Sequence, residues 1–397
     1  MEQKIVLAGA CRTPIGSMGG SLSSVSAADL GSTVIKAAIE RAGIKSEDVD
    51  HVYMGNVLQG GQGQNVARQA AVKAGIPYQV PAVTINAVCG SGLDCVNMAA
   101  LLIKAGEAEI VVAGGTENMS KAPYFLENAR FGYRLGDGKL KDAMITDALW
   151  DAFHDYHMGI TAENVADQWC VSREEQDAFA FHSQKKAVKA LENKVFAEEI
   201  IPVEVSRRKD TFVFAEDESP RKDASLEKMA KLRTAFKKDG TVTAANASTI
   251  NDGAAAMIVM SEEKAKELDV EIIGYYVGGG LAGVDPEIMG VGPVASTRKT
   301  LDKLNMTIDD IDLFEANEAF AAQALAVQRD LEIPAEKLNV NGGAIALGHP
   351  VGASGTRILV SLLHEMKRSG KKTGLATLCI GGGMGCTVIV EGRKESI

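Results

Sequence analysis

Cysteine, histidine and aromatic residues are scarce in this sequence. Only six cysteines and six histidines occur among 397 residues, and aromatic residues make up 5%. The cysteines are irregularly spaced and form no CxxC pair, so neither a disulfide framework nor a cysteine-ligated zinc site is expected. We therefore expect reduced thiols in a reducing compartment and no bound metal.

Long apolar runs are also absent. No stretch approaches the roughly 18 apolar residues of a membrane-spanning helix, and the apolar run near the amino terminus is too short for a signal peptide. The formal net charge of −10 disfavours binding to nucleic acid or to an anionic membrane. These absences predict a cytoplasmic protein without nucleic-acid or membrane partners.

The remaining composition is that of a folded α/β protein. Hydrophobic residues make up 46% and charged residues 24%, and the chain is longer than one hydrophobic core usually supports. Residues 207–238 depart from the acidic balance, with ten Lys or Arg against six Asp or Glu. Such a segment is either a binding site for an anionic ligand or a solvated charged surface.

Strand and helix patterns alternate before residue 120 and again after residue 248. The alternation predicts a parallel or mixed sheet with helices on both faces. Residues 121–248 lose this rhythm and are interpreted as an insertion, in which Gly136–Gly138 is typical of a hairpin turn. The expected strands are 4–10, 49–58, 82–88, 108–115, 254–261 and 270–280, and the expected helices are 27–44, 66–76 and 91–105.

The second half of the sequence repeats features of the first in the same order. The matching pairs of segments are 46–56 with 307–317, 84–92 with 339–355, and 109–120 with 375–386. Three ordered matches predict a duplicated α/β unit. Open α/β sheets place their functional residues at strand ends. Corresponding strand ends would then carry Cys89, Asn317, His349 and Cys379.

Cys89 stands between an expected strand and an expected helix, in the stretch NAVCGSGLDC. The N–H groups and the positive end of that helix favour a thiolate. The small residues Gly90, Ser91 and Gly92 let a substrate approach the backbone closely. Cys89 is therefore either a nucleophile or one more small buried residue.

Three further candidates occupy strand ends or glycine-rich turns. His349 lies in GGAIALGHPVGASGTR, which fits neither common nucleotide-phosphate loop, and its turn position suits a base. Cys379 ends a strand before Gly381–Gly383, whose N–H groups can bind an oxyanion. Asn317 opens an apolar helix, either as its N-cap or as a functional residue.

The other cysteines and histidines have no context that favours catalysis. His157, in YHMGITAENVA, fits either a core histidine or a site residue. We interpret the remaining cysteines as structural and the remaining histidines as satisfied core residues: Cys11, Cys95, Cys170 and Cys386, and His51, His154, His182 and His364.

Four segments together, NAVCGSGL, NEAF, GHPVGASG and CIGGGMG, resemble the thiolases in order and separation. The likeness covers essentially the whole chain, and His157 before Met158 is typical of the short-chain, biosynthetic branch. The resemblance implies an α/β thiolase fold, with duplicated βαβαβαββ domains in five αβαβα layers and a loop domain inserted in the first. The implied domains are 1–120 plus 249–272, the loop domain 121–248, and 273–397.

The resemblance also implies an activity. Thiolases of this branch are acyltransferases that reversibly condense two acetyl-CoA to acetoacetyl-CoA and CoA, in two ping-pong steps, without a bound cofactor. By position, Cys89 would carry the acetyl group, His349 would take its proton, and Cys379 would remove the α-proton of the second acetyl-CoA. Asn317 would hold a water for the enolate oxygen. The N–H groups of Gly381 and Cys89 would hold the tetrahedral adduct.

The resemblance also implies a coenzyme A site, and coenzyme A would be the anionic ligand of the basic segment. The residues of this site would be His157, Met158, Arg221, Phe236 and Ser248. Thr234 and Thr249 stand where the biosynthetic pattern has proline and glycine. The family is dimeric or tetrameric, and residues 130–144 would form a hairpin that joins two dimers into a tetramer.

Related activities remain as alternatives. A degradative 3-ketoacyl-CoA thiolase of broader chain length shares these motifs, and a non-catalytic acyl-CoA or lipid carrier shares the fold. A ketoacyl synthase is disfavoured because it uses two histidines where this chain has His349 and Cys379. A nicotinamide dehydrogenase is disfavoured because no GxGxxG follows the first strand.

Overall fold

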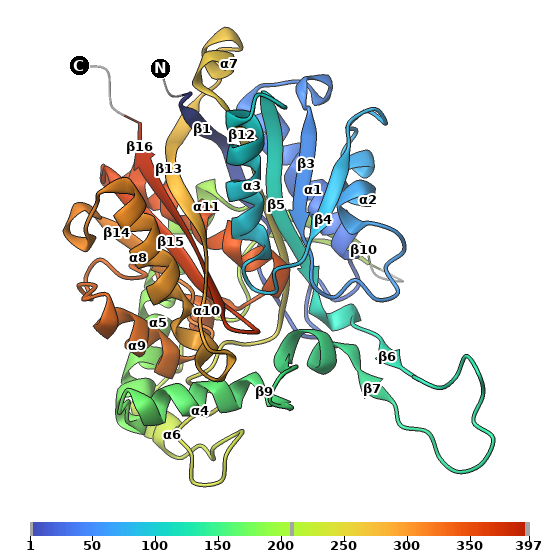
Figure 1. Cartoon of the computed structure of the whole chain (residues 1–397), viewed down its shortest axis with the longest axis vertical. Helices are drawn as coiled ribbons and strands as arrows, with labels where there is room; N and C mark the ends of the chain where they lie inside the picture. The colour runs from blue at the N-terminus through green and yellow to red at the C-terminus, as the bar shows by residue number, and fades with distance from the viewer. Residues whose placement is uncertain (1–2, 207–209, 394–397) are drawn as a thin grey trace.

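The computed structural model describes residues 3–206 and 210–393, and its centre is a mixed sheet of ten strands. In Figure 1 the amino-terminal strands lie on the right and the carboxy-terminal strands on the left. In sheet order the strands are β14 (Leu313–Ala316), β15 (Thr373–Ile380), β16 (Met384–Gly392), β13 (Ile272–Gly283), β1 (Ile5–Arg12), β12 (Asn251–Ser261), β5 (Ile110–Asn118), β3 (His51–Gly55) and β4 (Ala82–Ile85), with β2 (Gly16–Ser17) paired to β12.

Helices cover both halves of this sheet. The long helices α3 (Ser91–Lys104) and α11 (Val351–Ser369) lie between the two halves and pack against each other and against strands of both. The outer faces are covered by α1 (Ala27–Ala42) and α2 (Val66–Lys73) on one side and by α8 (Gly292–Leu304) and α9 (Ala321–Asp330) on the other. The resulting order of helix, sheet, helix, sheet and helix confirms the predicted five layers.

The alternation of side chains along the strands explains the layers. In β1, Val6 belongs to the core beneath α1, whereas Ile5 and Leu7 belong to the central core around α3 and α11. In β15, Leu375 faces the outer core and Leu378 the central one. Because successive residues point to opposite faces, strands buried on both faces must be apolar almost throughout. This is why the strands were recognisable as apolar runs.

The predicted duplication recurs in the hydrogen bonds. Asp50, just before β3, accepts bonds of 2.7 and 2.9 Å from two successive backbone N–H groups where β5 starts. Asp312, just before β14, accepts bonds of 2.9 and 3.1 Å from two N–H groups where β15 starts. In each half of the structure, an aspartate at the equivalent position thus joins the corresponding pair of strands.

The insertion contains helices that its sequence did not reveal. Its elements are β6 (Tyr124–Phe125), β7 (Lys141–Asp142), β8 (Trp150–Asp151), β9 (Tyr156–His157), α4 (Met158–Gln168), α5 (Arg173–Glu192), β10 (Val203–Ser206), β11 (Thr211–Phe214) and α6 (Leu226–Ala230). The long helix α5 escaped prediction because its buried residues are small or polar and leave no apolar period. They are Gln176, Asp177, Ala180, Ser183, Gln184, Ala187 and Ala190.

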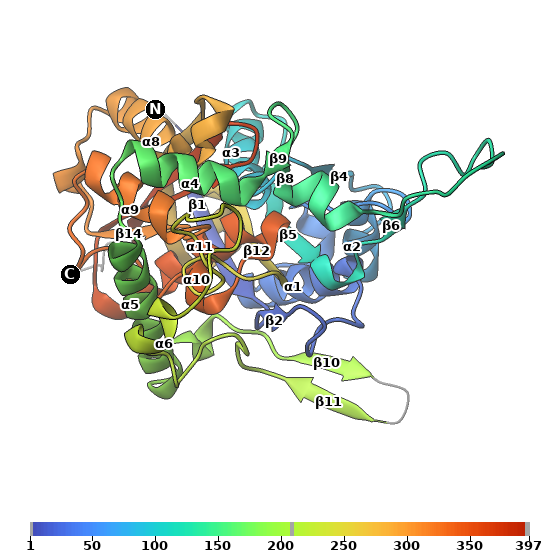
Figure 2. The ribbon, with the colours of Figure 1, turned by 90° about the horizontal axis from the view of Figure 1, so that it is seen from below.

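The predicted tight turn at Gly136–Gly138 is wrong. Strands β6 and β7 do pair as a hairpin, but residues 126–140 connect them as an extended arm that projects from the molecule (Figures 1 and 2). The apolar side chains of Phe131 and Leu135 are 87% and 100% exposed. Within the described residues, no backbone hydrogen bond closes residues 135–139 into a tight turn.

Two other expectations concern the basic segment and membrane-spanning helices. In the basic segment, residues 207–209 lie outside the described residues. Across residues 3–206 and 210–393, no helix combines the length and the apolar character needed to cross a membrane. Two short helices complete the described elements, α7 (Glu262–Glu267) and α10 (Ala344–Leu347).

A buried arginine fastens the insertion to the sheet. Arg12, in β1, is fully buried, and its guanidinium forms a 2.5 Å bond with Glu199 and two bonds of 2.8 and 2.9 Å with Asp217. These carboxylates raise the pKa of Arg12 despite its burial. Bidentate geometry of this kind is the strong form of a charge-assisted hydrogen bond.

Replacing this arginine should strongly destabilise the fold. In Arg12→Met, two buried carboxylates lose their cation, and we expect the free energy of unfolding to fall by about 3–5 kcal/mol. Urea unfolding followed by circular dichroism measures the change. The matched control is Lys36→Met, which breaks an exposed pair with Glu40 and should cost at most about 0.5 kcal/mol. Equal losses in the two variants would contradict this account.

Candidate active site

A strained turn between β4 and α3 presents Cys89. The Ser91 hydroxyl accepts a 2.9 Å bond from the Ala87 N–H and donates a 2.6 Å bond to the Val88 carbonyl. Val88 has a φ of +45°, which is unfavourable for a β-branched residue by about 1–3 kcal/mol. The hydrogen bonds of Ser91 hold that conformation, and Cys89 follows it directly at the start of the helix.

Burial controls the ionisation of Cys89. Backbone N–H groups of Gly381 and of Cys89 itself bond to its sulfur and favour the thiolate. Removal from water is the larger effect, and it raises the pKa of Cys89 to about 11. The backbone N–H groups thus favour the thiolate as expected, but burial outweighs them in the resting site. Cys89 rests as a neutral thiol, and a base must take its proton.

His349 is a buried, neutral imidazole. Its Nδ1 lies 2.6 Å from the Ser354 hydroxyl, which itself donates to the Pro350 carbonyl. The hydroxyl must therefore accept from Nδ1–H, and this network assigns the unprotonated position to Nε2. Burial, and secondarily Arg357, lowers the pKa of His349 to about 3. The free Nε2 lies 3.5 Å from the side-chain nitrogen of Asn317.

Asn317 does not cap a helix. It follows β14, whereas the N-cap position of α9 is Phe320. Its backbone N–H donates a 3.0 Å bond to the Thr377 carbonyl, and its side-chain nitrogen faces His349. Its Oδ1 atom is buried and has no hydrogen-bond partner in the described part of the chain. A buried acceptor without a partner is unusual and is available to a ligand or water.

Cys379 and the glycines after it form the opposite wall of the site. Cys379, in β15, is fully buried, and its pKa is raised by burial and by the nearby Cys89. Gly382 and Gly383 both have φ of +88°, and a side chain on Gly383 would approach backbone oxygen to 2.4 Å. Only glycine permits this turn, which brings the Gly381 N–H to the sulfur of Cys89.

Aromatic and apolar side chains surround Cys379. Met158, Phe236 and Cys379 belong to one apolar cluster. His157 caps α4 by accepting a 3.0 Å bond from the Gly159 N–H, and its ring stacks on Phe236 with centroids 4.6 Å apart. Burial lowers the pKa of His157. His157 is thus a helix cap that faces the cluster, and this local role had no sequence signal.

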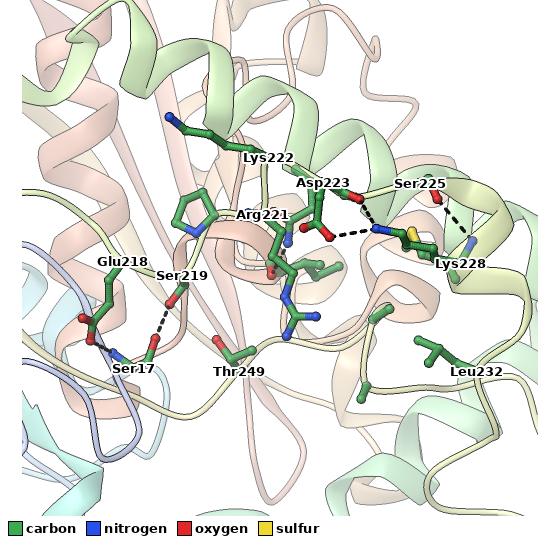
Figure 3. A pocket seen from close by; sticks show the side chains of 17 residues that line it. Ser17, Glu218, Ser219, Arg221, Lys222, Asp223, Ser225, Lys228, Leu232 and Thr249 are labelled. Atoms are coloured by element: carbon green, nitrogen blue, oxygen red, sulfur yellow. Dashed lines mark hydrogen bonds and ion pairs between the residues drawn. The ribbon is translucent and has the colours of Figure 1, made fainter.

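Arg221 lines a separate cavity of about 640 Å³, shown in Figure 3. Its lining includes the cations Arg221, Lys222 and Lys228, the carboxylates of Glu218 and Asp223, and Thr249. Ser248 precedes Thr249, and its N–H donates a 2.9 Å bond to the carbonyl of Ala319 in the apolar cluster. The candidate residues therefore form two groups, one at the apolar cluster around Cys379 and one at the cavity, with Ser248 between them.

Sequence reasoning missed the residues that support these groups. Ser354 orients the His349 ring, and Asn251 accepts a 3.0 Å bond from the His349 N–H. Glu117, fully buried in β5, accepts backbone bonds of 2.9–3.2 Å from the loop after β3 and from Gly352. Burial raises the pKa of Glu117 to about 7. The available signal was a single carboxylate in a strand that is otherwise uncharged.

The other cysteines have different surroundings. Cys11, Cys95 and Cys386 are fully buried, as their structural interpretation predicts, whereas Cys170 is exposed between α4 and α5 and packs against no core. The structural interpretation of Cys170 is therefore wrong. Within the described residues, no group of His, Cys, Asp and Glu side chains is arranged to hold a metal ion.

Comparison with known proteins agrees with this geometry. An acetyl-CoA acetyltransferase of Syntrophomonas wolfei is 58% identical over 395 residues, which cover 98% of this chain and 100% of that protein. The crystal structure of the Bacillus anthracis acetyl-CoA acetyltransferase matches with a TM-score of 0.97 and 45% identity, over 99% of each chain. The structure of human mitochondrial 3-ketoacyl-CoA thiolase matches with a TM-score of 0.96 and 43% identity, also over 99% of each chain.

Models of protein families extend the comparison to the whole fold. Residues 5–263 match the model for the thiolase N-terminal domain, and residues 270–392 match the model for the thiolase C-terminal domain. The two matches divide the chain near β13, between the two halves of the duplicated structure. On fold, site geometry and sequence together, this chain belongs to the thiolase family.

Proposed function

We propose that the protein reversibly condenses two molecules of acetyl-CoA to acetoacetyl-CoA and CoA through an acetyl group carried on Cys89. One observation carries the proposal: two neutral thiols, Cys89 and Cys379, lie near each other. The neutral imidazole of His349 faces Asn317, whose backbone N–H donates to Thr377 in the strand of Cys379. Acyl transfer with carbon–carbon bond formation needs both a nucleophile and a separate base for the α-proton. The names of the similar acetyltransferases support the choice of acetyl-CoA.

In the first half-reaction, Cys89 gives its proton to Nε2 of His349, and its sulfur attacks the thioester carbonyl carbon. The oxyanion is held by the N–H groups of Gly381 and Cys89, which already bond to the sulfur. The bond from carbon to CoA sulfur then breaks, and the leaving sulfur takes the proton of Cys379. This leaves acetyl-Cys89, a Cys379 thiolate and a protonated His349. A single oxyanion donor is worth about 10²- to 10³-fold in rate.

In the second half-reaction, the Cys379 thiolate removes an α-proton from a second acetyl-CoA. The enolate oxygen is stabilised by the protonated Nε2 of His349 and by a water on Asn317, whose buried Oδ1 has no partner within residues 3–206 and 210–393. The enolate carbon attacks acetyl-Cys89, and the sulfur of Cys89 leaves and regains its proton from His349. All groups return to their starting states, so the cycle balances and runs in either direction.

The proposed coenzyme A site extends from the cavity beside Arg221 to the apolar cluster around Cys379. The adenine and phosphates would occupy the cavity beside Arg221, where lysines balance phosphate charge. The pantetheine arm would pass Ser248 and Phe236 and end beside His157 and Met158, close to Cys379. We further propose that residues 121–248 act as a loop domain between the thiolase domains 1–120 plus 249–272 and 273–397, and that the protein works in the cytoplasm.

The acetyl-enzyme is the first test of this function. After brief incubation with acetyl-CoA and acid quenching, peptide mass spectrometry should find an acetyl group on Cys89. We expect no label in Cys89→Ala. In Cys379→Ser, label should form but condensation should fall by at least about 10²-fold, because the α-proton loses its base. The control Cys170→Ser alters an exposed thiol outside the site and should match the wild type. An unlabelled, folded wild type would contradict the proposal and favour an acyl-CoA carrier, and labelling by long acyl-CoA would favour a degradative thiolase.

Alkylation of Cys89 should report its raised pKa. Below a pKa of about 11, the thiolate fraction rises about tenfold per pH unit, so the rate with iodoacetamide should rise continuously from pH 7 to pH 9. His349 stays neutral over this range because its pKa is lowered to about 3, so it adds no inflection. Peptide mapping measures the rate, with a free cysteine derivative of pKa about 8.5 as reference. A plateau below pH 8 would show a lowered pKa instead.

We also propose a tetramer in which the arm between β6 and β7 joins two dimers. The arm exposes a row of large apolar side chains, which a partner would bury. The variant Phe131→Asp with Leu135→Asp should halve the mass in light scattering from four chains to two. The control Val213→Asp alters an apolar residue on β11 that is 64% exposed and should leave four chains. A wild-type mass of two chains, or a double variant that keeps four, would refute the role of the arm.

A further inference from the structure

One buried amide connects the turn of His349 with the wall of the coenzyme cavity. Asn251, at the start of β12, is fully buried. Its Oδ1 accepts bonds of 3.0 Å from the His349 N–H and 2.8 Å from the Thr249 hydroxyl. Its Nδ2 donates bonds of 3.1 Å to the Gly16 carbonyl and 3.0 Å to the Ser219 hydroxyl. Two acceptor positions and two donors are all that an asparagine side chain has.

The orientation of this amide is unambiguous. The backbone N–H of His349 is only a donor and the carbonyl of Gly16 is only an acceptor, so exchanging Oδ1 and Nδ2 would break both bonds. The amide also packs directly on the peptide before His349. Gly348 has a φ of +109°, and a side chain there would come within 2.5 Å of Asn251. The position of Asn251 therefore sets the position of the His349 backbone.

Two of the partners of Asn251 belong to the cavity wall. Thr249 and Ser219 both line the cavity, and Figure 3 shows them on neighbouring loops. Ser219 is held in turn by a 3.1 Å bond to the hydroxyl of Ser17. The hydroxyl of Thr249 donates to Oδ1 of Asn251. The proton of this hydroxyl is therefore already bonded to the amide.

His349 depends on this amide for its placement. Its ring is oriented by Ser354, and its backbone N–H is held by Asn251. A proton acceptor must stay within hydrogen-bond reach of the thiol it serves, and a displacement of a fraction of an ångström lowers the rate. Without the Thr249 hydroxyl, Oδ1 would retain a single partner and the amide would be held less firmly.

We propose that Thr249 is a positioning residue for His349 and acts through Asn251. The inference rests on the proposed function in one respect, that His349 takes the proton of Cys89. This positioning role differs from a role in which Thr249 only lines the cavity. A wall residue affects how tightly acetyl-CoA binds, whereas a positioning residue affects how fast bound acetyl-CoA reacts.

The test compares Thr249→Val with Thr249→Ser. Valine keeps the shape of threonine and removes the hydroxyl, and serine keeps the hydroxyl. Rapid-quench mass spectrometry measures the rate of Cys89 acetylation across acetyl-CoA concentrations. In Thr249→Val we expect the saturating rate to fall about three- to tenfold, the size of effect from losing one hydrogen bond, with the half-saturating concentration unchanged. Thr249→Ser should recover the wild-type rate to within about twofold.

A matched control removes a hydroxyl elsewhere. Thr33→Val deletes a 3.0 Å bond to the Asp29 carbonyl on α1 and should leave acetylation unchanged. The inference is overturned if Thr249→Val raises only the half-saturating concentration, if its rate equals that of the wild type, or if Thr249→Ser is as slow as Thr249→Val.

A second measurement separates this inference from the proposed function. Hydrogen–deuterium exchange of the His349 backbone N–H needs no acetyl-CoA, and this N–H donates to Oδ1 of Asn251. Thr249→Val should speed the exchange by a similar factor, and Thr249→Ser should restore the wild-type rate. A wild type that is not acetylated would refute the proposed function alone, because the exchange rates still decide whether Thr249 holds the His349 backbone in place. Equal exchange in wild type and Thr249→Val would overturn the inference whatever the acetylation result.

Discussion

Desolvation of two thiols and one imidazole is the constraint on which the site depends. Burial raises the pKa values of Cys89 and Cys379 and lowers that of His349, so all three groups rest uncharged at neutral pH. In the proposed mechanism, charges would form only during the reaction, where the fixed N–H groups of Cys89 and Gly381 would receive them without competition from water. A helix end alone would have favoured a resting thiolate, but the loss of hydration is the larger effect.

Such burial is possible because the site is assembled from both halves of a duplicated sheet. Cys89 comes from the first half, and Asn317, His349 and Cys379 come from the second. The central helices α3 and α11 start beside these residues and pack tightly enough that glycines are needed where they cross. A side chain on Gly92 would approach Thr356 to 2.7 Å, and one on Gly355 would approach Leu93 to 2.3 Å. Close packing of the middle layer therefore holds the reacting groups together.

The insertion completes the site from outside the sheet. It contributes Met158 and Phe236 to the apolar cluster around Cys379, with His157 stacked on Phe236, and it lines the cavity beside Arg221. Arg12 fastens it to β1 through buried carboxylates, and Asn251 links the loop of Ser219 to the turn of His349. The insertion is thus joined to the sheet by polar contacts that cross large sequence distances, unlike the apolar contacts that hold the sheet layers together.

The sequence by itself determined the layered α/β architecture, the duplication and the identity of the principal candidates, because apolar periodicity and short motifs are local properties. It also located the helix α1 and its end at Gly43. Only the tertiary structure decided the ionisation of Cys89 and the contact of Asn317 with His349, since both depend on burial and on partners far along the chain. The same holds for α5, whose buried face is polar, and for Asn251 and Glu117, whose partners lie in other elements. The pattern of apolar residues along the sequence shows which face of a helix or strand is buried. The exposure of a side chain to water and its hydrogen-bond partners are set only when distant segments pack together.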